Sequence, residues 1–161
     1  MSFKILRAKT EDRYDIQNIN IICLPENYDI SIWNHCLSFD TSFIAKSGDK
    51  IVAYVLCGDN YDIYSIAVLP EYQNKGAGKL LLLHVLKDVR SRNMERIILQ
   101  VRISNPAIRL YEKVGFTKDK ILPKYYKDGE DGWKMVYKND LFKRRDVKTN
   151  LFDLEDDFLL S

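Results

Sequence analysis

The sequence is poor in the residues that build disulfide and metal frameworks. It has three cysteines and two histidines in 161 residues. The cysteines, Cys23, Cys36 and Cys57, are odd in number and lack CxxC spacing, which argues against a disulfide scaffold or a zinc site. Neither His35 nor His84 has partners at ligand spacing, so no metal is expected. Free thiols fit a reducing compartment, and we expect a cytoplasmic protein.

Long apolar runs and an excess of one charge are also missing. No run of 18 apolar residues occurs, and the first 15 residues lack the apolar core of a secretory signal. Lysine and arginine number 25 against 23 acids, a formal charge of +2, so no global field attracts nucleic acid. We therefore expect neither membrane association nor direct nucleic-acid binding. With 46% hydrophobic residues, the composition is that of a globular protein.

Hydrophobic periodicity predicts an alternation of strands and helices. Gly48 and Asp49 supply the turn of a hairpin, and Leu80, Leu83 and Leu86, with Leu82 and Val89 beside them, give an apolar stripe at helical spacing. The order predicts an α+β fold with a mixed sheet. The expected strands are 3–7, 42–45, 51–57, 61–69, 96–101, 116–121 and 132–137, and the expected helices are 10–23, 31–37, 76–92 and 105–114.

The last residues differ in character from the rest. Residues 143–148 read KRRDVK, and residues 151–161 read LFDLEDDFLLS, with four acids and no base. We predict one domain over 1–142 and a charged, mobile tail over 143–161. The alternation of acidic and apolar residues in this tail also fits docking on a basic surface.

A glycine-containing turn before the leucine-rich helix carries the first chemical signal. Gln73-Asn74-Lys75-Gly76-Ala77-Gly78 joins a strand to a helix start, where unpaired amides and the helix dipole attract anions. Glycine lets a phosphate approach the backbone, so a pyrophosphate is the natural ligand. Two common phosphate loops are excluded, because neither GxxxxGK[ST] nor GxGxxG is present. Taken alone, a G-x-G pair is better explained as a tight strand-to-helix connection.

Residues 73–78 match the acyl-CoA loop motif of the GCN5-related N-acetyltransferase (GNAT) superfamily: Gln or Arg, two residues, Gly, any residue, Gly or Ala. The strand Ser65–Val68 and the run from Asn105 through Tyr111 to Gly115-Phe116 resemble two further blocks of that superfamily. The resemblance covers residues 3–141. It implies an acetyl-CoA-dependent enzyme with the GNAT fold, a mixed, mostly antiparallel sheet flanked by about four helices.

Two more blocks narrow the resemblance. Leu24-Pro25-Glu26-Asn27-Tyr28 and the run from Lys124 to Asp131 resemble the loops that frame the peptide site of protein N-terminal acetyltransferases. The similarity is greatest to the catalytic subunit of the A-type enzymes and their archaeal relatives, followed by bacterial ribosomal-protein alanine acetyltransferases. The implied partners are protein or peptide N-termini, and an auxiliary ribosome-anchoring subunit is left open.

The resemblance also assigns residue roles. Tyr111 stands at the general-acid position, and the usual base positions read Asp62 and Gln100; glutamine is no base, and Asp62 needs a raised pKa. Glu26 is the first candidate for a catalytic carboxylate. The implied acetyl-CoA contacts are Ile66, Ala67, Val68, Gln73, Asn74, Lys75, Gly76, Ala77, Gly78, Lys79, Asn105 and Tyr111. The implied peptide contacts are Leu24, Pro25, Glu26, Tyr28, Arg102, Tyr125 and Tyr126.

The weak set of bases favours one class of acceptor. An α-amine has a pKa near 8 and a lysine side chain one near 10.4, so the α-amine is cheaper to deprotonate by roughly 3 kcal/mol. This favours protein N-termini. The alternatives are an enzyme for small amines, internal lysines or a specific ribosomal protein, and a non-catalytic acyl-CoA-binding module.

Overall fold

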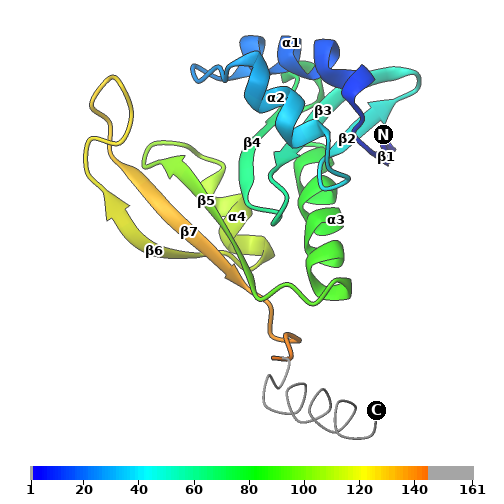
Figure 1. Ribbon diagram of the computed structural model, residues 1–161. Coiled ribbons are helices and arrows are strands. Elements are labelled where there is room, and N and C mark those ends of the chain that lie inside the picture. The colour runs from blue at the N-terminus through cyan, green and yellow to red at the C-terminus, as the bar shows by residue number, and fades with distance from the viewer. Residues whose placement is uncertain (1, 145–161) are drawn as a thin grey trace, which may run out of the picture.

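The computed structural model describes residues 2–144 and contains one seven-stranded sheet (Figure 1). The strands are ordered β1-β2-β3-β4-β5-β7-β6, and neighbours run antiparallel except for β4 and β5. This is the predicted mixed sheet. The strands are β1 (Lys4–Arg7), β2 (Phe43–Ser47), β3 (Lys50–Cys57), β4 (Ile63–Val68), β5 (Arg96–Arg102), β6 (Thr117–Leu122) and β7 (Gly132–Lys138).

Helices cover both faces of the sheet. Within the described residues the α-helices are α1 (Arg13–Cys23), α2 (Ile30–Leu37), α3 (Ala77–Ser91) and α4 (Ile108–Val114). Two short 3-10 turns precede α1 and α3, at Thr10–Asp12 and Pro70–Tyr72. The order of strands and helices along the chain agrees with the sequence prediction and with the fold that the GNAT resemblance implies.

Strand β3, the third of the seven in the sheet, separates two cores. Its alternate side chains Val52, Tyr54 and Leu56 pack with α1 and α2, whereas Ala53 and Val55 pack with α3 and α4. Because both faces are covered, all of these residues are buried. The site therefore lies in a sheet whose central strands are held from both sides.

The buried face of α3 differs from the predicted stripe. Leu80 and Leu83 are 36% and 42% exposed, so the expectation that they face the core is wrong. The run of four leucines at 80–83 allows two faces. In a helix of 3.6 residues per turn, residues spaced by three gradually leave one face. The face that packs on the sheet instead contains Leu81, Val85 and Val89, which are spaced by four. The buried apolar residues of α3 are Ala77, Leu81, Leu82, Val85, Leu86 and Val89.

Two helices begin later than predicted. Residues 10–12 form a 3-10 turn before α1, and residues 105–107 form a turn before α4. In that turn the Ala107 N–H donates to Asn105 Oδ1 at 2.9 Å, and the Ile108 N–H donates to the Asn105 carbonyl at 3.2 Å. Asn105 thus organises the entry to α4 without belonging to it. Most of the predicted tail, residues 145–161, lies outside the described range.

Strands β4 and β5 diverge at the centre of the sheet. In the described chain their parallel register holds one pair, Ile63 with Leu99, although the strands span six and seven residues. The later part of β4 therefore lacks a neighbouring strand on its β5 side. Separately, no described helix is both long and apolar enough to cross a bilayer.

Candidate active site

The turn at residues 73–78 leaves backbone donors free at the start of α3. Gly76 has φ +92°, a left-handed conformation that favours glycine, and a Cβ there would meet nothing within 4 Å. The first helical bond runs from the Leu80 N–H to the Gly76 carbonyl at 3.0 Å, and no side chain caps the helix. The amides of Ala77, Gly78 and Lys79 thus precede that bond, and such amides bind anions.

The second glycine of the turn also serves the packing of two helices. A Cβ on Gly78 would lie 3.2 Å from Leu110 Cδ2, a side chain of α4, and 3.9 Å from Val68 Cγ2. Gly78 therefore lets α4 pack closely against the first turn of α3. Two side chains brace the same turn: Gln73 Nε2 donates to the Val68 carbonyl at 3.0 Å, and Lys75 Nζ donates to the Glu71 carbonyl at 3.1 Å.

The gap between β4 and β5 presents a backbone N–H to a ligand. The Leu69 N–H donates to the Val52 carbonyl of β3 at 2.9 Å. Successive amides point to opposite edges of a strand, so the N–H groups of Ile66 and Val68 point away from β3, into the gap. An extended acyl chain in this gap could be bound by these groups. The arrangement fits acetyl-CoA, with its pyrophosphate at the turn.

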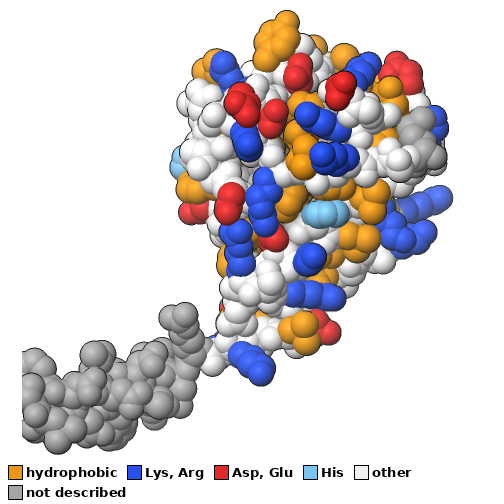
Figure 2. All heavy atoms as spheres, turned by 90° about the vertical axis from the view of Figure 1, so that its right-hand side faces the viewer, with side chains coloured by type: hydrophobic (Ala, Val, Ile, Leu, Met, Phe, Trp, Pro, Cys, Tyr) orange, Lys and Arg blue, Asp and Glu red, His pale blue; other side chains and the backbone are white. Residues whose placement is uncertain are grey.

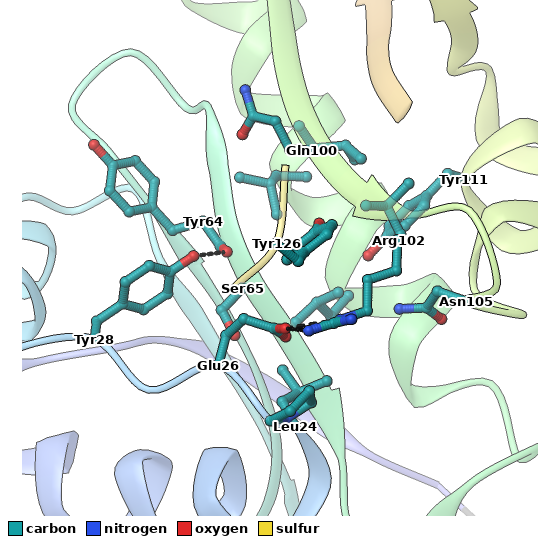
Figure 3. Close-up of a pocket in the computed structure, with 15 residues that line it drawn as sticks. Leu24, Glu26, Tyr28, Tyr64, Ser65, Gln100, Arg102, Asn105, Tyr111 and Tyr126 are labelled. Carbon is teal, nitrogen blue, oxygen red and sulfur yellow. Dashed lines mark hydrogen bonds and ion pairs between the residues drawn. The ribbon is translucent and has the colours of Figure 1, made fainter. Parts of the chain in front are cut away.

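A pocket opens between the diverging strands and receives side chains from both sides (Figure 3). Tyr111, Asn105 and Arg102 reach it from one side, and Glu26 and Tyr28 of the α1–α2 loop reach it from the other (Figure 3). The remaining lining residues are Leu24, Pro25, Ile63, Tyr64, Ser65, Ile66, Leu99, Gln100, Val101 and Tyr126. Candidate acetyl-donor and peptide contacts thus meet in one pocket.

Tyr111 lies at the inner end of that pocket. The residue is 5% exposed, and its ring packs edge-on against Phe116 at 5.9 Å. Across residues 2–144, no hydrogen bond to its hydroxyl is formed. Burial raises the pKa of Tyr111 well above its usual value, and Tyr126 and Tyr54 raise it further. The phenol therefore keeps its proton, as a general acid must.

Arg102, the last residue of β5, binds three carboxylates at the pocket mouth. Its guanidinium donates to Glu26 Oε1 at 2.6 and 2.8 Å, to Asp128 at 2.7 Å and to Glu130 at 2.9 Å. It also lies over the Tyr126 ring, 4.3 Å from the centroid. We call these residues, Glu26, Arg102, Tyr126, Asp128 and Glu130, the Arg102 cluster. It joins the α1–α2 loop to the β6–β7 loop.

The charges of the Arg102 cluster do not cancel. One guanidinium faces three carboxylates, which leaves a formal charge of −2. The pKa of Asp128 is lowered by the Glu130 backbone N–H and by Arg102, and that of Glu130 by the Ser104 hydroxyl and Arg102. Asp128 and Glu130 therefore stay ionised, and the mouth attracts a cation such as an α-ammonium group.

The two candidate bases are placed differently. Glu26 lines the pocket, and its carboxylate is paired with Arg102 at 2.6 Å. Asp62 is not among the lining residues. Its carboxylate accepts hydrogen bonds from the Ile98 N–H of β5 and from Asn60 Nδ2, both at 2.9 Å, and so joins the start of β4 to β5. This geometry supports a structural role for Asp62.

The expected peptide-side tyrosines are also separated by the structure. Tyr126 lines the pocket. Tyr125 does not line it; its ring packs edge-on against the Tyr126 ring, with 5.1 Å between the centroids, and the residue is 51% exposed. The Tyr28 hydroxyl donates to the Tyr64 carbonyl at 2.7 Å, which ties the α1–α2 loop to β4 (Figure 3). Burial raises the pKa of Tyr28 to about 12. Tyr28 therefore acts as a neutral wall of the pocket.

Sequence reasoning missed the polar residues behind the pocket. Ser65 lines it, and its hydroxyl lies 2.6 Å from the Tyr54 hydroxyl, while Asn20 Nδ2 donates to Tyr54 at 2.8 Å. The three residues of this network lie on α1, β3 and β4, far apart in the sequence, so no local sequence pattern predicts it. Tyr64 was missed too; its place at the start of β4 was the only available signal. Among the described residues, no group of three potential metal ligands gathers.

Comparison with known proteins agrees with this geometry. The sequence profile of the acetyltransferase (GNAT) family matches residues 11–116, about two thirds of the chain. The chain belongs to the GNAT family. An N-alpha-acetyltransferase of Saccharolobus solfataricus is 36% identical over 153 aligned positions, covering 83% of this chain and 92% of that GNAT protein.

Two solved GNAT structures share the fold. The ribosomal-protein-S18-alanine N-acetyltransferase of Escherichia coli superposes with a TM-score of 0.79 at 25% identity, covering 91% of this chain and 98% of that one. Arabidopsis thaliana Naa50, in complex with the bisubstrate analogue CoA-Ac-MVNAL, gives 0.78 at 22% identity, covering 86% and 100%. The latter likeness establishes the fold alone.

Proposed function

We propose that this GNAT enzyme is a protein N-terminal acetyltransferase, which transfers acetyl from acetyl-CoA to the free α-amine of a protein N-terminus. One observation carries the proposal: a single pocket joins the β4–β5 gap, which fits an acyl-CoA, to a mouth whose net negative charge fits an ammonium group. The relatives named above support the same substrate class.

The donor side relies on backbone groups. The amides of Ala77, Gly78 and Lys79 bind the pyrophosphate, and Asn74, Lys75 and Gln73 shape the turn that presents them. Ile66, Ala67 and Val68 line the acyl chain, with the Val68 N–H directed at the thioester carbonyl. When bound, acetyl-CoA supplies an acetyl group activated as a thioester. The Val68 N–H stabilises the negative charge that develops on the carbonyl oxygen during attack.

Tyr111 protonates the leaving sulfur. The α-amine nitrogen forms a bond to the acetyl carbon, the carbon–sulfur bond breaks, and the Tyr111 hydroxyl gives its proton to the sulfur. The proton released from the amine returns to the phenolate through water. The raised pKa of Tyr111 keeps the phenol protonated until the thiolate forms.

The acceptor needs little help to lose its proton. With a pKa near 8, about a tenth of an α-amine is neutral at pH 7, whereas a lysine amine is neutral about once in 2,500 molecules. We propose that Glu26, held by Arg102, orients the amine and takes, through water, the first proton that the α-ammonium group loses before attack; the second, released on attack, goes to the Tyr111 phenolate. Leu24, Pro25, Tyr28 and Tyr126 then contact the first residues of the peptide. This weak base set separates N-termini from internal lysines.

The decisive experiment locates the transferred acetyl group. The enzyme is given acetyl-CoA and a peptide with a free N-terminus and an internal lysine, or the same peptide with a blocked N-terminus, and the products are fragmented by mass spectrometry. We expect acetylation of the α-amine and none of the blocked peptide. Lysine acetylation would contradict the proposal, and binding of acetyl-CoA without any transfer would support a binding module.

The proposal extends to partners and location. Apolar side chains of the α1–α2 region are exposed, including Ile21 at 64%, Ile22 at 62% and Ile30 at 56%. Such a patch suits an auxiliary subunit that brings the enzyme to emerging N-termini. The three free thiols of the protein suit the cytoplasm, where these N-termini arise.

A panel of N-terminal peptides distinguishes action on many protein N-termini from action on one ribosomal protein. In the second case only one peptide of the panel would react.

A further inference from the structure

A second groove lies on α3, apart from the acetyl-transfer pocket. It encloses about 460 Å³, and none of its residues lines that pocket. Leu83 and Leu141, 42% and 60% exposed, contribute apolar surface, and Lys87 and Arg90 contribute positive charge. Leu86, Ser91 and Val114 complete the lining. Figure 2 shows hydrophobic and basic side chains gathered on the face that α3 presents.

The composition of the groove is complementary to one segment of the same chain. The groove has two basic residues and no acid. Residues 151–160 read LFDLEDDFLL, which is six apolar residues, four acids and no base. This segment lies outside the described range. Its apolar side chains match the leucines of the groove, and its carboxylates match Lys87 and Arg90.

The chain leaves the domain beside this groove. The Lys143 N–H donates to Asn93 Oδ1, and Asn93 Nδ2 donates to the Lys143 carbonyl, both at 2.9 Å. Asn93 lies two residues beyond the end of α3. From Arg144 the seven residues to Leu151 can extend about 23 Å, while α3 rises only about 12 Å from Leu83 to Ser91. Residues 151–160 can therefore reach the whole groove.

We propose that residues 151–160 dock in this α3 groove of their own chain. A tether of this length gives an effective concentration on the order of 1 mM, so a contact with a dissociation constant of about 0.1 mM holds the segment about nine-tenths of the time. Docking would cover the exposed side chains of Leu83 and Leu141, which do not pack in either core. This proposal stands apart from the acetyl-transfer reaction.

Hydrogen exchange of the full chain, followed by mass spectrometry, tests the proposal. We expect the amides of residues 151–160 to exchange about tenfold more slowly than in a K87E/R90E variant. The protection should not depend on protein concentration. A K46E/K50E variant is the matched control, since it makes the same charge change on β2 and β3, and its tail should remain protected.

A second set of variants acts on the tail and guards against misfolding of the groove variant. Reversal of Asp153, Glu155, Asp156 and Asp157 to lysine should remove the protection, and its combination with K87E/R90E should restore it. The proposal is overturned by an unprotected tail in the wild type, or by protection that survives both reversals. Protection that rises with protein concentration also overturns it, because a second copy would then be the occupant.

Discussion

The two halves of the proposed active site consist of different kinds of chemical group. The acetyl-donor half consists of backbone amides in the β4–β5 gap and at the start of α3, shaped by Gly76. The amine half consists of long charged side chains, with Arg102 held among three carboxylates from two loops. A backbone site is fixed by local conformation, whereas a side-chain site depends on partners far apart in sequence. The halves should therefore respond differently to substitution.

Removing the Tyr111 hydroxyl should give the largest effect, because Tyr111 lies where the halves meet. For Tyr111→Phe we expect kcat to fall by about 10²- to 10³-fold, with the affinity for acetyl-CoA nearly unchanged. Steady-state kinetics and calorimetry measure the two quantities. Tyr137→Phe is the control: Tyr137 is also buried, and its hydroxyl accepts a bond from Arg90. Equal activity of Tyr111→Phe and wild type would refute the acid assignment.

Removing the guanidinium should affect the amine half alone. Arg102→Leu leaves Glu26, Asp128 and Glu130 to repel one another, so both loops lose their position. We expect kcat/KM for the peptide to fall by about 10²-fold, the usual scale for a misplaced substrate, while the KM for acetyl-CoA stays within about twofold. Arg92→Leu, which breaks an exposed pair with Asp40 at 3.0 Å, should leave both constants unchanged. A comparable rise in the KM for acetyl-CoA in Arg102→Leu would contradict the prediction, because it would show that the two halves do not act separately.

Adding a side chain at position 76 of the donor turn should affect the acetyl-donor half. Gly76→Ala places a Cβ at φ +92°, and we expect the acetyl-CoA affinity to weaken about tenfold as the amides move. Gly48→Ala, at φ +61° in the β2–β3 hairpin, is the matched control. Both variants should lose about 1–2 kcal/mol of unfolding free energy. If both variants bind acetyl-CoA like wild type, the turn does not hold the pyrophosphate.

Acid pH should weaken the amine half by a small amount. The folded-state pKa values of Asp128 and Glu130 lie below their ordinary values of 3.8 and 4.5. Between the folded-state and the ordinary pKa values the unfolded chain binds more protons than the folded chain. The two carboxylates therefore stabilise the fold at a pH above their ordinary pKa values, and this stabilisation is lost as the pH falls through their folded-state pKa values. We expect the denaturation midpoint to drop between pH 5 and pH 3, and to drop less in Arg102→Leu. Identical slopes would show that Arg102 does not hold these carboxylates.

The sequence indicates the local geometry of the donor turn more directly than the ion pairs of the amine half, and the site assignments in both halves remain predictions. The turn at 73–78 and the entry to α4 depend on neighbouring residues, so a short motif contains most of the information. The pairing of Arg102 with Glu26 joins positions 76 residues apart, and no local pattern indicates it. Asp62 illustrates the same limit, because its partner Ile98 lies on another strand.

The fold shows a similar division. The order of strands and helices along the chain and the β2–β3 hairpin followed from β-rich runs and turn residues, and the comparison with solved structures agrees with the predicted fold. The buried face of α3 did not follow, because four successive leucines fit two faces and only packing against the sheet selects one. Leu83, left outside by that choice, lines the groove proposed for the tail.

A crystal structure with bound CoA and a substrate peptide tests the central claim most directly. The account predicts the pyrophosphate on the amides of residues 76–79, the sulfur beside Tyr111, and the peptide α-amine between Glu26 and the Val68 N–H. A coenzyme bound outside the β4–β5 gap, or a peptide whose lysine side chain rather than its N-terminus enters the pocket, would contradict it.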